Sequence, residues 1–82
     1  MDLNEAEQAF LRGMRAITLD EQGREIFVGL TPDESVEYLG LSRRNEQGED
    51  MSANPRYLEL HQRHEAERER IVAGEAPLDR AP

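Results

Sequence analysis

The segment IFVGLTPDESVEYLG, residues 26–40, decides the fold, because it is the most apolar part of this 82-residue chain and has the clearest signals for where an element starts and ends. The alternation of Ile26, Val28 and Leu30 indicates a β-strand, with Phe27 on the opposite face. The apolar run then stops at Thr31, a residue type that is favoured as a helix N-cap. We therefore expect an extended segment that leads directly into a helix.

Thr31 has the features of a helix N-cap. Pro32 fits the first helical position, where the missing N–H group costs nothing. Glu34 follows Thr31 by three residues, so its carboxylate can accept a hydrogen bond from the cap N–H group. The sequence predicts a short helix from Pro32 to about Leu39, which Gly40 ends.

A second capping pattern lies near the N-terminus, where Asn4 is followed three residues later by Glu7. Behind it, apolar residues recur every three or four positions and indicate one face of an amphipathic helix over residues 5–16. These residues are Leu3, Ala6, Phe10, Met14 and Ile17.

The periodicity then changes from helical to alternating, which predicts a β-hairpin that pairs residues 16–19 with residues 25–29. Asp20 and Gly23 fit the first and last positions of a type I turn between the two strands. Alternatively, the first helix continues through Leu19 and the chain contains one strand.

A polar stretch without periodicity covers residues 42–53 and predicts a long loop. Asn54 and Pro55 then start a last helix, which extends to about Ala73 and stops at Gly74. The middle of this helix has no large aliphatic residue. We therefore expect it to dock at its two ends, or to complete its packing on a partner. Residues 74–82 are expected to form a disordered tail.

Together these elements predict one α+β domain over residues 1–73, in the order helix, β-hairpin, short helix, long C-terminal helix. The chain is short, so its core is small. We expect that core to contain Phe10, Met14, Ile17, Leu19, Ile26, Val28, Leu30, Val36, Leu39, Tyr57 and Leu60.

The composition excludes several classes of function. The chain has 18 acidic and 10 basic residues, a net charge of −8, and every basic residue is arginine. Without lysine it cannot form a Schiff base or a P-loop, and without cysteine it has no disulfide or thiolate site. The acidic N-terminus does not resemble a signal peptide, and no apolar run is long enough to span a membrane. We expect a soluble, cytoplasmic protein that does not bind membranes, and its acidic charge disfavours nucleic acid as a partner.

The segment LTPDESVEYLGLSRR, residues 30–44, resembles the first half of the helix-turn-helix motif in excisionase-like DNA-binding proteins. The resemblance implies that a first helix ends at Leu39 and Gly40, and that Ser42, Arg43 and Arg44 face DNA. The continuation over residues 45–50 departs from the pattern, because it lacks apolar residues and contains three acids that repel phosphate.

His64 and Glu65 follow His61 by three and four residues, which places them on the same face of the last helix as His61. Two imidazoles and a carboxylate at this spacing are a weak candidate for a metal site. The ordinary alternative is two partly exposed histidines in the hydrophilic middle of a helix, whose charge changes near neutral pH.

No nucleophile elbow or paired-carboxylate motif is present, so we expect no enzymatic activity and no cofactor. The arginines and tyrosines favour a protein interface. The predicted function is a small bacterial-type interaction or regulatory module that binds a protein partner or forms a homodimer. The alternative is a DNA-binding regulator that uses residues 31–44. The candidate contact residues are Tyr57, His61, His64, Arg68, Arg43 and Arg44.

Overall fold

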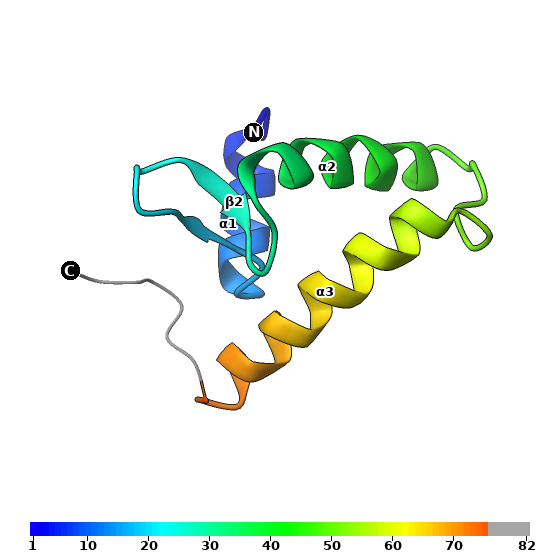
Figure 1. Ribbon diagram of the computed structural model, residues 1–82. Coiled ribbons are helices and arrows are strands. Elements are labelled where there is room, and N and C mark those ends of the chain that lie inside the picture. Colours follow the sequence, from blue (N-terminus) through cyan, green and yellow to red (C-terminus); the bar gives the residue numbers. More distant parts are fainter. Residues whose placement is uncertain (76–82) are drawn as a thin grey trace.

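The computed structural model describes residues 1–75 and has an α+β fold, as predicted (Figure 1). Its elements are α1 (Glu5–Gly13), β1 (Ile17–Leu19), β2 (Glu25–Phe27), α2 (Pro32–Glu46) and α3 (Pro55–Val72). Helices α2 and α3 run in opposite directions and diverge from the loop that joins them, and the hairpin of β1 and β2 lies at the open end of this V (Figure 1).

The predicted helix starts are confirmed. Asn4 and Thr31 both form complete capping boxes, in which the cap side chain accepts from the backbone N–H of Glu7 or Glu34 and the glutamate accepts from the cap N–H. Asn54 accepts from the N–H of Tyr57 at the start of α3. These caps depend on residues within one helical turn, which is why the local sequence predicts them.

The two strands form the predicted antiparallel hairpin, so the alternative of a single strand is wrong. Ile17 pairs with Phe27, and Thr18 pairs with Ile26. The side chain of Asp20 accepts hydrogen bonds from two backbone N–H groups of the turn, and Gly23 has a positive φ of 79°. The predicted orientation of the second strand is wrong, because Phe27 is buried and Ile26 is only half-buried.

α1 ends earlier than predicted. Its last residue is Gly13, and Arg15 then takes a left-handed conformation with φ of 58°. This turn lets the N–H of Ala16 donate to the carbonyl of Leu11 at 2.8 Å and sends the chain into β1. A non-glycine residue is uncommon at such a position, so no local sequence signal indicates this turn.

Helix α2 is longer than the predicted short helix. It continues through Gly40 to Glu46, so the first part of the predicted loop over residues 42–53 is helical. Leu41, one residue beyond Gly40, is buried against the core. Burial of a leucine contributes about 1.5–3 kcal/mol, which offsets the cost of about 1 kcal/mol for glycine inside a helix.

The connection between α2 and α3 is anchored by Met51, which is buried in the core. The side-chain amide of Asn54 lies 3.7 Å from the sulfur of Met51 and donates to it. Burial of Met51 therefore holds the loop against the domain. The residues around Met51 are mostly polar, so the sequence did not predict that this residue is buried.

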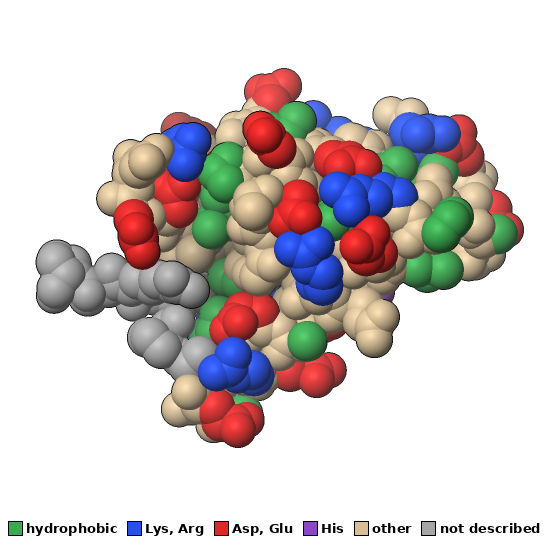
Figure 2. All heavy atoms as spheres, in the orientation of Figure 1, with side chains coloured by type: hydrophobic (Ala, Val, Ile, Leu, Met, Phe, Trp, Pro, Cys, Tyr) green, Lys and Arg blue, Asp and Glu red, His purple; other side chains and the backbone are tan. Residues whose placement is uncertain are grey.

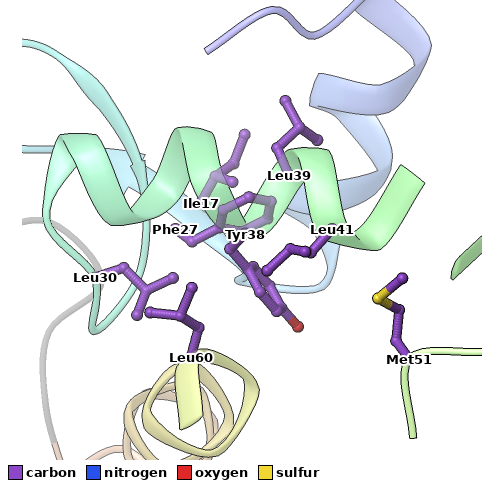
Figure 3. Packing of buried hydrophobic residues seen from close by; sticks show 8 residues of the cluster. All are labelled: Ile17, Phe27, Leu30, Tyr38, Leu39, Leu41, Met51 and Leu60. Atoms are coloured by element: carbon purple, nitrogen blue, oxygen red, sulfur yellow. The ribbon is translucent and has the colours of Figure 1, made fainter. Parts of the chain in front are cut away.

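The core lies between the hairpin and the facing sides of α2 and α3 (Figure 3). Several predicted core residues are buried, namely Ile17, Val28, Leu30, Leu39 and Leu60. Phe10, Met14, Leu19 and Val36 are instead exposed, and Ile26 and Tyr57 are half-buried. The buried residues that the sequence did not predict are Ala16, Thr18, Phe27, Ser35, Tyr38, Leu41, Met51, His64 and Ile71.

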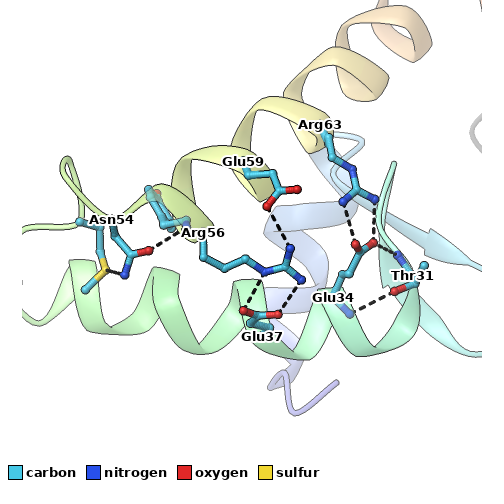
Figure 4. A network of polar contacts seen from close by, with 9 residues as sticks. Thr31, Glu34, Glu37, Asn54, Arg56, Glu59 and Arg63 are labelled. Atoms are coloured by element: carbon cyan, nitrogen blue, oxygen red, sulfur yellow. Dashed lines mark hydrogen bonds and ion pairs between the residues drawn. The ribbon is translucent and has the colours of Figure 1, made fainter.

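Ion pairs connect α2 and α3 along the edge of their interface, which we call the seam. Arg56 makes paired hydrogen bonds of 2.9 Å to the carboxylate of Glu37, and Arg63 makes paired bonds of 2.7 and 2.8 Å to Glu34 (Figure 4). In the space-filling view, acidic and basic side chains alternate along this seam (Figure 2). This face of the helix pair is therefore closed by ion pairs.

α3 docks along its length, which contradicts the expectation that it docks at its two ends alone. Leu60, His64 and Ile71 are all buried on one face. The helix ends at the predicted place, where Gly74 has a φ of 79° and the N–H of Glu75 donates to the carbonyl of Arg70. Residues 74 and 75 thus form a helix-capping turn, and the rest of the predicted disordered tail, residues 76–82, lies outside the described residues.

Candidate functional site

The most distinctive surface of the molecule is on α1. This helix is amphipathic, yet none of its residues is buried. Phe10 is 65% exposed and Met14 is 40% exposed, although both belong to the apolar stripe that the sequence assigned to the core. Within α1, Leu11 packs partly against the core, as do Met1 and Leu3 before the helix. Sequence periodicity identified the stripe correctly but cannot tell whether the stripe meets the core or the solvent.

Beside Phe10 and Met14 lies a cavity of about 260 Å³ between α1, α2 and α3. Phe27 of the hairpin and Leu39 of α2 contribute to its apolar lining. This volume lies just below the range of about 300–1,000 Å³ that is usual for ligand pockets, and an apolar lining with a few polar groups is typical of such pockets. We call Phe10, Met14 and this cavity the α1 face.

His64 is the most buried polar group that lines the cavity, at 4% exposed. Its Nδ1 lies 2.9 Å from the carbonyl oxygen of Val28. A carbonyl oxygen can only accept, so Nδ1 donates and carries the ring proton. Burial lowers the pKa of His64 below its usual value, and the bond to Val28 opposes this shift only in part. The ring is therefore neutral at pH 7, and Nε2 has a free electron pair.

The position of Nε2 follows from the hydrogen bonds around it. The described residues form no hydrogen bond to this atom, and none of their fully buried side-chain nitrogen or oxygen atoms lacks a partner. Nε2 is therefore not fully buried, and the cavity of about 260 Å³ is a hollow that His64 lines. The cavity thus has apolar walls and a hydrogen-bond acceptor of fixed tautomer.

A column of aromatic rings holds this part of α3 against α2. Tyr57 stacks on both Tyr38 and His61, with ring centroids 5.7 and 5.8 Å apart, and Tyr38 also contacts the ring of His64. The hydroxyl of Tyr38 lies 2.7 Å from Nδ1 of His61. Burial raises the pKa of Tyr38, so its hydroxyl stays protonated at neutral pH. These contacts fix the orientation of His64.

Two arginines of the cavity rim attach α1 to the other helices. Arg43 of α2 donates to the carbonyl of Asp2 at 2.6 Å and forms an ion pair with Glu7. Arg68 of α3 donates to the carbonyl of Met14 at 3.3 Å and pairs with Glu65. Both guanidinium groups therefore stabilise the walls of the cavity.

The six predicted contact residues fall into different environments. Tyr57, His61 and His64 come together in the aromatic column and face the core, Arg68 and Arg43 lie at the cavity rim, and Arg44 is exposed and pairs with Glu49 at 2.6 Å. The sequence identified the correct region of α3 but not the direction in which its side chains point. The sequence did not identify Phe10, Met14 or Tyr38 as site residues. Phe10 and Met14 belong to a periodic apolar pattern, whereas Tyr38 had no such signal.

The metal candidate does not form a cluster. Within residues 1–75, no group of three or more histidine or acidic side chains is placed to hold an ion. Of the three candidate residues His61, His64 and Glu65, the two histidines use Nδ1 in contacts with Tyr38 and Val28, and Glu65 pairs with Arg68. Their spacing along the helix therefore reflects packing between α3, α2 and the hairpin.

The turn that a helix-turn-helix requires after Leu39 and Gly40 is not formed, because α2 continues without a break. Ser42, Arg43 and Arg44 lie in the second half of this helix, and Arg43 and Arg44 are both engaged in intramolecular ion pairs. The arrangement that the resemblance implied is therefore wrong.

A larger, shallower hollow of about 510 Å³ follows the hairpin, lined by residues that include Leu19, Arg24, Glu67 and Ile71. Its charged side chains lie at the surface, and among residues 1–75 no buried titratable group lines it, in contrast to the cavity beside α1. The α1 face is therefore the better candidate site.

No protein-family model, curated protein or solved structure matches this chain. In the part of the chain that the structure describes, no helix is long and apolar enough to cross a membrane. The functional argument therefore depends on the geometry of the α1 face.

Proposed function

We propose that this chain is a small acidic, non-enzymatic interaction module that binds a protein partner through the α1 face. One observation carries the proposal: an amphipathic helix with no buried residue presents Phe10 and Met14 to solvent beside an apolar cavity. Exposed apolar surface that adjoins a hollow is typical of protein interaction sites, and aromatic residues and methionine are enriched in them.

Charge favours a different protein over a second copy as the partner. The chain has a net charge of −8, so two copies repel each other, whereas a neutral or basic protein is attracted. The homodimer that the sequence also suggested is therefore the alternative outcome of the test. The DNA-binding alternative has no observation in its favour, because the charge is unfavourable and Arg43 and Arg44 are paired within the chain.

The proposal is tested by Phe10→Glu, with Val36→Glu as a matched control. Both residues are exposed apolar side chains on helices, at 65% and 60% exposure, but only Phe10 lies on the α1 face. Proteins captured from a lysate of the native host are compared between the wild type and the two variants. We expect Phe10→Glu to lose a protein that the wild type and Val36→Glu both retain. The same captured set for all three chains would contradict the proposal.

Self-association is measured on the same proteins by light scattering over a concentration series. A monomer at all concentrations agrees with a different protein as the partner. If the wild type and Val36→Glu are dimers and Phe10→Glu is a monomer, the α1 face binds a second copy of the chain instead.

A further inference from the structure

The cavity of the α1 face has charged side chains at its rim, together with apolar side chains and one almost completely buried imidazole in its lining. Phe10 at the edge is mostly exposed, whereas His64 is almost completely buried. A group that enters this cavity packs against apolar side chains such as Phe10 and Leu39 and comes close to the imidazole of His64. The volume of about 260 Å³ is sufficient for one aromatic ring, since a cavity of about 150 Å³ binds benzene.

The chemistry of His64 determines which group fits. A neutral imidazole with its proton on Nδ1 can only accept a hydrogen bond at Nε2. A phenylalanine or leucine side chain would displace water from Nε2 without replacing its hydrogen bond. A phenol places its donor at the far end of the ring, where it reaches a buried acceptor, whereas the N–H group of tryptophan lies on the side of the ring system.

We propose that this cavity binds a tyrosine side chain of the protein partner, with the tyrosine hydroxyl donating to Nε2 of His64. The inference depends on the proposed function, because it names the anchor that the partner inserts into the α1 face. Large aromatic residues that enter a central pocket contribute most of the binding free energy at many interfaces.

A second copy of this chain does not supply that anchor. Its tyrosines, Tyr38 and Tyr57, belong to the aromatic column of their own domain, and its exposed Phe10 has no donor. Phe10 and Met14, which line the cavity, are 65% and 40% exposed, and a protein partner covers more of this exposed apolar surface than a small free metabolite does. Both observations favour a side chain from a different protein.

The test compares N-acetyl-tyrosinamide with N-acetyl-phenylalaninamide in NMR titrations of the full chain. The two probes differ by one hydroxyl group. We expect the tyrosine probe to bind in the millimolar range and to shift the Nε2 resonance of His64. One neutral hydrogen bond contributes about 0.5–1.5 kcal/mol, so the phenylalanine probe should bind roughly 2- to 12-fold more weakly.

A matched pair of variants places the probe in the cavity. Ser42→Leu adds a side chain that fills the cavity from α2, and Asn45→Leu adds the same side chain to an exposed position of the same helix. We expect Ser42→Leu to lose tyrosine-probe binding and Asn45→Leu to retain it. Ser42→Leu also removes the side-chain hydrogen bond between Ser42 and Tyr38, so the amide NMR spectrum of each variant is compared with that of the wild type to verify the fold before the titration.

Equal affinities for the two probes, or binding that persists in Ser42→Leu, would overturn the inference. Failure of the tyrosine probe to bind would also overturn it, and the capture experiment with Phe10→Glu would still decide the proposed function independently. A tyrosine probe that binds selectively, together with a captured partner that Ser42→Leu loses, would support both.

Discussion

Gly29, at the corner between β2 and α2, lies directly against the backbone of Arg63 in α3. A Cβ atom built on Gly29 would lie 2.8 Å from the carbonyl oxygen of Arg63 and 3.0 Å from the Cβ of Glu67. The backbone of Gly29 also has a positive φ of 83°. These two constraints explain why the chain uses glycine where it turns from the hairpin into α2 under the third helix.

We predict that Gly29→Ala lowers the free energy of unfolding by roughly 2–4 kcal/mol, from the left-handed backbone and the close contact together. The control is Gly23→Ala, since Gly23 has a similar φ of 79° but no atom within 4 Å of its added Cβ. It should lose only about 1–2 kcal/mol, measured by urea denaturation. Equal losses in the two variants would show that the contact with α3 is not tight.

The second prediction concerns Ser35, which is completely buried and whose hydroxyl accepts a hydrogen bond of 2.9 Å from the backbone N–H of Phe27. Ser35→Ala leaves that buried N–H without a partner and should cost about 1–3 kcal/mol. Ser52→Ala, at an exposed position, should change stability by less than about 0.5 kcal/mol. If the two variants have the same denaturation midpoint, Ser35 does not connect the strand to α2.

The third prediction concerns stability in acid. The Arg63 guanidinium and the N–H of Thr31 lower the pKa of Glu34 from 4.5 to about 2. This carboxylate therefore stabilises the fold above pH 4.5, and the stabilisation is lost as the pH falls from 4.5 towards 2. Glu34→Gln should cost about 1–2 kcal/mol at pH 7, the sum of a helix cap and a half-exposed ion pair.

The difference between Glu34→Gln and the wild type should disappear as the pH approaches 2, because both side chains are then neutral. As a control, Glu59→Gln removes an exposed ion pair with Arg56 and should cost less than about 1 kcal/mol at pH 7. A constant difference for Glu34→Gln between pH 7 and pH 2 would rule out the proposed ionisation.

The fourth prediction concerns His64 in a separate pH range. Burial lowers its folded-state pKa below the usual 6.5, and nearby His61 and Arg68 act in the same direction, whereas Glu65 and the bond to Val28 oppose it. The unfolded chain therefore binds more protons below pH 6.5. The contribution of His64 to stability is complete above that pH and falls as the pH decreases.

The slope from His64 amounts to at most about 1.4 kcal/mol per pH unit. His64→Phe keeps a ring against Phe27 but cannot be protonated, so its stability should depend less on pH between 5 and 7 than that of the wild type. Urea midpoints at pH 5, 6, 7 and 8 measure this. If stability depends on pH as steeply in His64→Phe as in the wild type, groups other than His64 cause the pH dependence.

The extent to which sequence predicts this fold follows the range of the interactions. The caps at Asn4 and Thr31 and the turn at Asp20 are contacts within five residues, and all were predicted. Gly40 was predicted to end a helix, but burial of Leu41 outweighs its low helix propensity. Contacts with other elements therefore decide where a helix ends when the local signal is weak.

The candidate site was harder to predict for the same reason. The stripe with Phe10 and Met14 has the same period whether it meets a core or water, and only the positions of the other elements distinguish the two. His64 has a polar side chain, yet it follows Leu60 by four residues and precedes Ile71 by seven. This spacing was the available signal that His64 belongs to the buried face of α3.

The absence of any buried residue in α1 has a consequence for the dynamics of the chain. This helix is held by the half-buried Leu3 and Leu11 and by partly exposed arginine contacts, whereas the elements from Ile17 to Val72 share the core. Detachment of α1 therefore costs less free energy than global unfolding, and its amide protons should exchange first. A protein that covers the first helix would slow this exchange and raise the melting temperature at the same time.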